Sequence, residues 1–420
     1  MRIQDNKLII NTKSFYSYAA SIILIYFFFI NNFSRVFSFS SVGITVVLSA
    51  IGIWGLYALF NGKVRLRVDL FWLCALVIVL ISSKAAIGRG DYYWCAMYVT
   101  LTLSVFMLTA RTEWITGAYK LIGMLAMVHV CATIVLYLFS PTLYSMTLAH
   151  FWDELPGGVS INDAYKAGLT SHYSTNGIYC AVAVLICSCK IIASNTRTAK
   201  DYVKLLLSII ALLLTTKRAH LLFSICAIIV VYFFFSRGNK VAKVFYILMI
   251  GILATMLVYV FAPFVPLIGN VVARFVDQDD ISSGRFVFWA QAYQLFLDNM
   301  WSGIGWGEYA GVNMYGTGVH NVYIQLLCEA GIPGFVVFIL AMGRTALWAI
   351  RDCHNHLNQV QLEMRTPFAF AVAFQVFILL YCLTGNCLYD QSVILYYIAC
   401  AISLSMHKLL KHNTSTPQNK

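Results

Sequence analysis

Apolar runs of about twenty residues follow one another along the whole of this 420-residue chain. A helix of that length spans the hydrocarbon core of a bilayer. Charged residues make up only 11% of the sequence and the mean hydropathy is +0.76, whereas a soluble domain carries roughly 25% charged residues. Because so few charges are insufficient to cover a water-facing surface, the sequence predicts an all-α, polytopic membrane protein.

We expect about 12 membrane-spanning helices in a single membrane domain, residues 1–420. The predicted spans are 14–33, 38–60, 70–86, 92–110, 121–139, 173–193, 203–216, 219–236, 244–262, 333–350, 368–385 and 392–407. Most lysines and arginines fall in segments on the side of the N-terminal tail, which the positive-inside rule places in the cytoplasm. An even number of spans then puts both termini there. The formal charge of +12 therefore reflects orientation in the bilayer and does not indicate a nucleic-acid partner.

Two long segments interrupt this pattern, and both are predicted on the outer side. The first covers residues 140–172. The second covers residues 263–332 and holds the longest polar interval of the chain, in which we expect short helices. Because long loops in compact architectures are commonly functional, the sequence predicts that the chemistry of this protein lies in the second loop.

Two adjacent cations, Lys217 and Arg218, lie between two apolar runs with almost no loop. A tight hairpin gives them little water, so they suit a phosphate or an anionic lipid headgroup. The alternative is that both side chains snorkel from a helix end into the interface.

The large outer loop supplies a third cation, Arg285. It stands at the start of an amphipathic segment in which Trp289, Ala292 and Phe296 recur at helical spacing. A helix N-terminus offers free amide groups to an anion, and arginine adds a bidentate fork. A solvated arginine on an interfacial helix is the alternative. Further along, Trp306 lies in the glycine-rich sequence Gly-Ile-Gly-Trp-Gly, where it either faces a glycan or anchors the chain at the membrane interface.

His320 and Asn321 precede the helix that enters the next span, and Glu329 follows within that helix. A neutral imidazole can take a proton from a hydroxyl group, although a surface histidine is more often inert. His172 and Asn176 are separated by four residues at the end of the first outer loop, so on a helix they share one face. We interpret this pair as a lining element, with a purely structural role as the alternative.

The order of these motifs, over about residues 160–390, resembles the bacterial O-antigen ligase and Wzy-type polysaccharide polymerase superfamily. The ligase pattern is present as His320, Asn321, nine residues, Gly331, two residues and Gly334. The Ser-Gly-Arg motif before Gly-Ile-Gly-Trp-Gly, the Lys-Arg hairpin, the sequence GLTSHYSTN and the late sequence GNCLYD at 385–390 are also similar to this family.

The resemblance implies an inverting, metal-independent glycosyltransferase of the GT-C type that needs no cofactor. Members of the family take a glycan from an undecaprenyl pyrophosphate carrier at the outer face of the bacterial cytoplasmic membrane. By motif, Arg218 and Arg285 hold the donor pyrophosphate, with Lys217 beside them, and His320 is the base on the acceptor hydroxyl. Supporting or lining roles fall on Asn321, His172, Asn176, Trp306 and Glu329. A flippase and a chain-length regulator of the same pathway are the implied protein partners.

Three functions fit these features. The leading hypothesis is a polysaccharide polymerase, which passes the glycan to a lipid-linked repeat unit, because TTKRAHLL and HNVYIQLLCEAGIPG are similar to the polymerase-type members. The second is an O-antigen ligase, which passes it to lipid A–core. The third is a lipid-linked glycan flippase, which also has about 12 spans and internal cations but lacks a long outer loop with a His-Asn helix entry.

Overall fold

The computed structural model confirms an all-α polytopic membrane protein. It describes residues 2–4, 7–9, 12–29, 41–62, 68–139, 142, 161–170, 172–236, 238–264, 269, 272, 284–356 and 360–415. The helices are α1 (Thr12–Phe29), α2 (Ser41–Phe60), α3 (Leu70–Ser82), α4 (Lys84–Gly88), α5 (Tyr93–Leu108), α6 (Trp114–Phe139), α8 (Tyr173–Ala193), α9 (Ala199–Leu214), α10 (Arg218–Phe235), α11 (Lys240–Phe261), α13 (Arg285–Asp298), α14 (Tyr309–Val312), α15 (Val322–His356), α16 (Leu362–Tyr381) and α17 (Ser392–Ser415). A 3-10 helix, η3 (Ile161–Lys166), and an antiparallel pair, β1 (Arg2–Gln4) and β2 (Lys7–Ile9), complete the described elements.

Each of the twelve expected spans overlaps at least one described helix. Eight helices of the described chain are long and apolar enough to cross a membrane: α2, α6, α8, α10, α11, α15, α16 and α17. Three shorter apolar helices, α1, α3 and α5, follow the same pattern. The remaining expected span corresponds to α9, which has 16 residues. The count of twelve and the GT-C architecture stay predictions.

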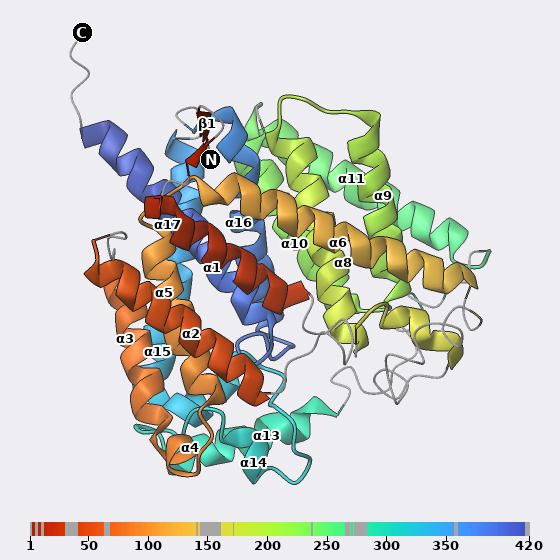
Figure 1. The fold of residues 1–420 in the computed structure, drawn as a ribbon. Coiled ribbons are helices and arrows are strands. Elements are labelled where there is room, and N and C mark those ends of the chain that lie inside the picture. The colour runs from red at the N-terminus through yellow and green to blue at the C-terminus, as the bar shows by residue number, and fades with distance from the viewer. Residues whose placement is uncertain are drawn as a thin grey trace.

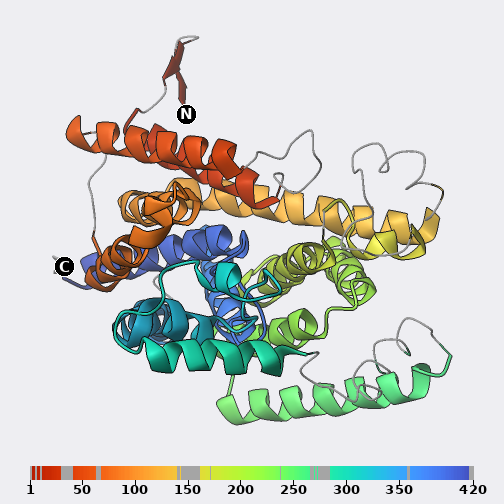
Figure 2. The same cartoon turned by 90° about the horizontal axis from the view of Figure 1, so that it is seen from below.

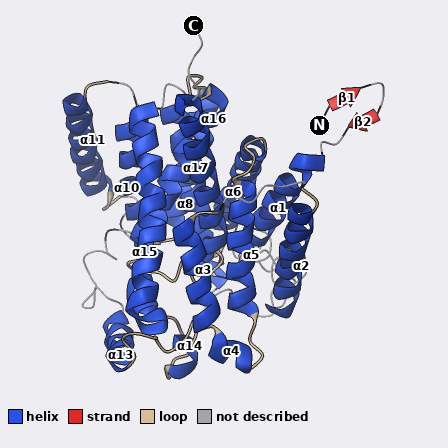
Figure 3. Ribbon diagram, turned by 90° about the vertical axis from the view of Figure 1, so that its left-hand side faces the viewer, coloured by secondary structure: helices blue, strands red, loops and turns tan. Residues whose placement is uncertain are grey.

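The two ends of the helix bundle carry different elements. In Figure 1 the N-terminal strands and the end of α17 lie at the top, whereas α4, α13 and α14 lie at the bottom, and Figure 3 shows the same arrangement. At the lower end, Arg89 binds both carboxylate oxygens of Glu308, at 2.5 and 2.6 Å, and so ties the end of α4 to the start of α14. The first described strands and the end of α17 therefore lie at the end opposite to α13 and α14.

The helices differ in how deeply they are packed. Helices α8, α16 and α17 form the interior, with 83%, 78% and 83% of their apolar windows buried, whereas the corresponding value for α11 is 0%. Figure 2 shows α11 apart from the other helices at one edge of the bundle. A helix that is apolar on every side and exposed on every side is stable only when lipid or another apolar surface covers it.

Two polar contacts join α3 to α15 inside the bundle. The carboxylate of Asp69, which caps α3, pairs with Arg344, and the indole of Trp72 donates to the hydroxyl of Thr345 at 3.0 Å. A polar group buried in an apolar bundle destabilises the fold unless it has a partner, so these contacts fix the register of the two helices. The register matters because α15 begins at the candidate site.

Candidate active site

His320 lies immediately before α15 in a conformation that few side chains adopt. Its φ is +58°, and it is one of two non-glycine residues with positive φ in the described part of the chain; the other is Thr216. Such a conformation costs about 1–3 kcal/mol and persists only where surrounding contacts impose it. Here the backbone N–H of His320 donates to Oδ1 of Asn386 at 2.8 Å. Two residues later, the backbone N–H of Val322 donates to the carbonyl of Cys382.

Asn386 also contacts the imidazole ring. Because its oxygen accepts the backbone N–H of His320, its amide nitrogen faces Nδ1 of the ring, at 3.4 Å. An amide nitrogen only donates, so this contact favours the neutral tautomer with the lone pair on Nδ1 and the proton on Nε2. The distance is at the long limit for a hydrogen bond, so the preference is weak. Nε2 is the ring nitrogen that faces away from Asn386.

The predicted cations act on this imidazole. Burial, and then electrostatic interactions with Arg285, Lys217 and His172, lower the pKa of His320 to about 4. The ring is half-buried and is therefore uncharged at neutral pH, the form that accepts a proton. His320 thus interacts electrostatically with three residues from three separate segments of the chain.

The Lys217–Arg218 hairpin has the predicted tight form. Helix α9 ends at Leu214 and α10 begins at Arg218, so only three residues separate the two helices. The left-handed conformation of Thr216 (φ +55°) makes this turn possible. The ammonium group of Lys217 lies 3.6 Å from the centroid of the Tyr173 ring, a cation–π contact that holds it at the start of α8. Arg218 is half-buried in the first turn of α10.

Helix α13 begins at Arg285, as the sequence predicts. Ala292 and Phe296 are buried on its inner face, and the indole N–H of Trp289 donates to the carbonyl of Val319 at 3.1 Å. Val319 directly precedes His320. The same helix that carries Arg285 is therefore anchored to the backbone beside the histidine.

Asn321 and Glu329 have supporting roles that are structural. The side-chain oxygen of Asn321 accepts from the amides of Tyr323 and Ile324, at 3.0 and 3.2 Å, and so caps the N-terminus of α15. The buried carboxylate of Glu329 accepts from the amides of Gly307 and Tyr309, at 2.8 and 3.1 Å. Glu329 thus fastens the glycine-rich loop to α15.

Each of the two glycines in the His-Asn motif is required for a different physical reason. Gly331 interrupts α15 with φ +65° and ψ −172°, and a Cβ there would lie 2.6 Å from the carbonyl oxygen of Trp301. Because of this break, carbonyls of the preceding turn have no partner within the helix. The backbone N–H groups of Ile304 and Gly305 in the loop donate to the carbonyls of Cys328 and Glu329, at 2.9 and 3.0 Å. At Gly334 a Cβ would lie 2.3 Å from the Cβ of Ala330 and 3.2 Å from the side chain of Ile78 in α3.

Three sequence expectations need correction. Trp306 neither faces a glycan nor anchors an interface: it is 1% exposed, and its ring packs against Tyr98, Phe338 and Tyr389. The preceding turn reverses direction at glycines and points the indole inward. Asn176 does not line a site, since its buried amide donates to Thr133 and to the carbonyl of Lys166.

His172 does not share a face with Asn176 either. It is the exposed N-cap of α8, and its Nδ1 accepts from the amide of Ser174 at 3.1 Å. A residue that caps a helix lies outside the helical periodicity, which is why the spacing of four residues was misleading. It nevertheless interacts electrostatically with His320, although burial and Lys217 lower the pKa of His172 itself.

Asn386 is the site residue that sequence reasoning missed. The sequence GNCLYD at 385–390 is similar to the family, but this similarity assigns no role to any residue in it. The signal available in the sequence is that Asn386, a hydrogen-bonding side chain, lies in a polar stretch between two apolar runs. Its partner is 66 residues away in the chain, and nothing in the local pattern indicates that partner.

Residues 203–339 match the family model described as O-antigen ligase, Wzy_C. The matched segment contains Lys217, Arg218, Arg285 and His320, the four residues of the predicted donor and acceptor machinery. No curated protein matches the chain.

Proposed function

We propose that this chain is a polysaccharide polymerase, because residues 203–339 match the family model described as O-antigen ligase, whose members are enzymes of glycan assembly. It transfers a glycan from an undecaprenyl-pyrophosphate-linked donor to a lipid-linked repeat-unit acceptor. Two observations carry this proposal: Arg285, Lys217 and His172 interact electrostatically with the imidazole of His320, and the helix that begins at Arg285 is hydrogen-bonded to the backbone beside that histidine.

The cations bind the donor. When the acceptor oxygen bonds to the anomeric carbon, the bond from that carbon to the pyrophosphate oxygen breaks and negative charge develops on the leaving group. Lys217, Arg218 and Arg285 stabilise this charge without a metal ion, because preorganised cations act strongly where water is excluded. Attack from the face opposite to the pyrophosphate inverts the anomeric centre.

His320 removes the proton of the acceptor hydroxyl. With a pKa of about 4 the ring is neutral under physiological conditions and can accept a proton as the new bond forms. We assign this role to Nε2, because Nδ1 faces Asn386. Acceptance at Nε2 requires the tautomer that is protonated on Nδ1, which the amide of Asn386 weakly disfavours.

The proposal also fixes the orientation of the protein. The N-terminal strands and the end of α17 lie at one end of the bundle, and α13 lies at the other. We assign the end with the termini to the cytoplasm and the end with α13 to the outer face of the bacterial cytoplasmic membrane. A flippase and a chain-length regulator are the proposed protein partners, since one delivers the lipid-linked unit and the other limits its growth.

An O-antigen ligase is the second candidate, because the matching family model carries that description. One experiment separates the two. Purified protein is incubated with lipid-linked repeat units in the absence of lipid A–core, and the products are resolved by length. Chain growth is the expected result. Transfer that occurs only after lipid A–core is added would make the protein a ligase.

Substitutions test the enzyme hypothesis itself. His320→Ala should lower the rate of elongation by about 10²–10⁴-fold, the usual contribution of general base catalysis, so that no polymer is detected. Arg285→Ala should likewise abolish detectable polymer. His354→Ala is the matched control, since His354 is an exposed histidine near the opposite end of the same helix α15. Polymer of normal length and amount from the His320 or Arg285 variant, inserted at wild-type level, would refute the enzyme hypothesis. A defect only in lipid translocation, with elongation in vitro intact, would identify a flippase.

A further inference from the structure

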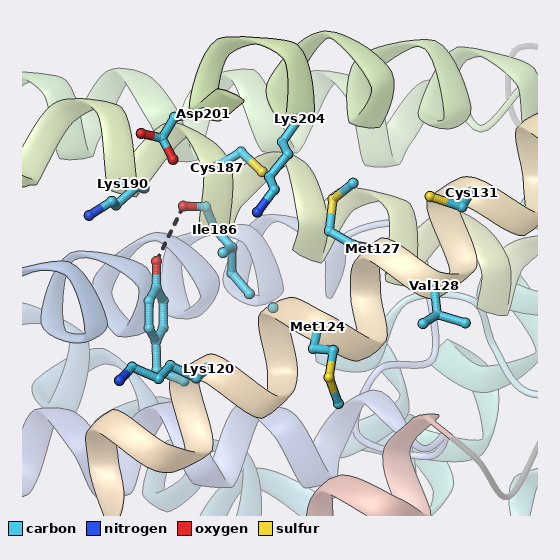
Figure 4. A pocket seen from close by; sticks show the side chains of 12 residues that line it. Lys120, Met124, Met127, Val128, Cys131, Ile186, Cys187, Lys190, Asp201 and Lys204 are labelled. Atoms are coloured by element: carbon cyan, nitrogen blue, oxygen red, sulfur yellow. Dashed lines mark hydrogen bonds between the residues drawn. The ribbon is translucent and has the colours of Figure 1, made fainter. Parts of the chain in front are cut away.

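A groove far from His320 combines basic and apolar side chains. It has a volume of about 760 Å³ and lies between α6, α8 and α9 (Figure 4), within the usual size of ligand sites. Lys190, near the end of α8, is 18 residues from His172 at its start. The groove therefore lies about 27 Å along α8 from the candidate active site. It belongs to the end of the bundle that we assign to the cytoplasm.

Polarity changes along the length of this groove. Figure 4 shows Lys120 and Lys190 at one end and Val128 and Cys131 at the other, with Met124 and Met127 between them and the ammonium group of Lys204 extending toward the space between the helices. Three lysines against Asp201 leave an excess of positive charge. Among the described residues, no ion pair with a carboxylate occupies any of the three lysines.

A second, more polar cavity continues from the basic end. It has a volume of about 530 Å³ and shares Tyr119, Lys120 and Lys190 with the first. Its other lining residues include Ser194, Asn195 and Thr196, in the turn between α8 and α9, and Glu363 at the start of α16. The two cavities together therefore carry three lysines against two carboxylates. The shared lysines thus stand at the junction of an apolar groove and a polar pocket.

We propose that these joined cavities bind one anionic glycerophospholipid of the leaflet on the side of the chain termini. An acyl chain lies along Met124, Met127 and Cys131, the phosphate lies at Lys120 and Lys190, and the polar headgroup enters the second cavity. Basic pockets between membrane helices favour anionic headgroups. Inorganic phosphate would leave the apolar half of the groove without a partner, and a zwitterionic lipid would not neutralise the lysines.

Lipid binding to the purified full-length protein tests this proposal. Native mass spectrometry compares phosphatidylglycerol with phosphatidylcholine of the same acyl chains. Each lysine near an anionic surface contributes about fivefold in affinity. The double variant Lys120→Gln/Lys190→Gln should therefore lose about 25-fold in affinity for phosphatidylglycerol and little for phosphatidylcholine. Lys200→Gln, which removes an exposed cation of α9 that lines neither cavity, should leave both unchanged.

Two further measurements complete the test. Cys131→Trp, at an exposed position, should fill the apolar end and lower phosphatidylglycerol binding without loss of folded protein. Sodium phosphate at equal concentration should not displace the lipid. Equal binding of both lipids, an equal loss in Lys200→Gln, or displacement by phosphate would each overturn the proposal. Because these readouts involve no glycan, they are independent of the proposed polymerase activity.

A different observation concerns the loop that holds His320. The sulfur atoms of Cys382 and Cys387 are 3.0 Å apart, and both residues are buried in the described structure. The S–S bond of a disulfide is about 2.04 Å, so a small movement brings these atoms to bonding distance. Cys387 adjoins Asn386, and the carbonyl of Cys382 accepts from the amide of Val322 at 2.8 Å.

We infer that Cys382 and Cys387 form a disulfide in the membrane-inserted protein. This inference rests on the proposed function, which places this loop at the outer face of the membrane. Disulfides persist in oxidising compartments outside the cytoplasm. During folding the two thiols lose two protons and two electrons to the disulfide of a thiol oxidant, which is reduced to two thiols. The bond closes the loop around Asn386 and fixes its contact with His320.

Peptide mass spectrometry after alkylation under denaturing conditions tests this bond. The peptide that holds both cysteines should be unalkylated and lighter by two hydrogens, whereas Cys400, buried in α17, should be alkylated. In Cys382→Ser the thiol of Cys387 should become alkylated. Full alkylation of both thiols in the wild-type protein would overturn the inference. Chain growth measured on the same preparation shows separately whether the proposed function holds.

Discussion

Replacing Asn386 with aspartate should move the acidic limb of the pH profile of chain growth to higher pH. The two side chains have nearly the same shape, so one carboxylate oxygen keeps the hydrogen bond from the backbone N–H of His320, at 2.8 Å in the wild-type protein. The other oxygen takes the place of the amide nitrogen, 3.4 Å from Nδ1. The carboxylate accepts where the amide donated, so it favours the tautomer protonated on Nδ1 and leaves the lone pair on Nε2.

The size of the effect follows from the same distance. Two unit charges 3.4 Å apart interact by about 5 kcal/mol at an effective dielectric constant of about 20, which sets an upper limit. Carboxylates near a cation typically change a pKa by about 1–3. The pKa of His320 should therefore rise from about 4 to about 5–7 in Asn386→Asp.

The assay is the rate of chain growth by purified protein as a function of pH. Because the neutral imidazole is the active form, a higher pKa means that activity is lost at a higher pH when acid is added. Above about pH 8 both forms of the enzyme have a neutral ring, and the variant should equal or exceed the wild type. Asn386→Ala is the control that removes both contacts, and it should lower the rate at every pH.

Two results would refute this reasoning. An acidic limb at the wild-type pH, with full activity, would mean that residue 386 does not act on the ring. An inactive Asn386→Asp beside an active Asn386→Ala would mean that His320 does not accept a proton at Nε2.

Three further predictions follow from individual contacts. Lys217→Met should raise the pKa of His320 and move the acidic limb to higher pH, because the charge of Lys217 is one of the causes that lower this pKa; an unchanged acidic limb would mean that the charge of Lys217 does not act on the ring. Gly331→Ala should destabilise the protein by at least about 1–2 kcal/mol, since its left-handed conformation is strained for other residues, and an unchanged melting temperature in detergent would contradict the break in α15. Asn321→Ala should cost about 0.5–2 kcal/mol through loss of the helix cap, while Asn321→Ser should retain most of it, so equal melting temperatures for the two variants would argue against the cap.

The elements of this fold were predictable because their signals are local. An apolar run of sufficient length predicts a helix in a membrane regardless of its neighbours. The positions of α9, α10 and the hairpin between them followed from the apolar runs on either side of Lys217 and Arg218. Arg285 was predicted at the start of a helix for the same reason, since Trp289 and Phe296 repeat at helical spacing.

The errors and omissions involve contacts between distant segments. Trp306 was expected at a surface because it lies in a polar loop, yet that loop folds back on α15 and buries the ring. Asn176 was expected to line a site because of its spacing from His172, but its partners are on α6 and η3. Asn386 could not be paired with His320 from the sequence, because the geometry that joins them arises only when α15 packs beside the loop after α16.

The convergence of cations around His320 is tested most directly by a structure of the protein with its lipid-linked donor bound. We predict that the two phosphates lie between Lys217 and Arg285, with the anomeric carbon on the side of Nε2 of His320. Phosphates bound elsewhere, or Lys217 and Arg285 on surfaces that no single diphosphate can bridge, would contradict the proposed mechanism.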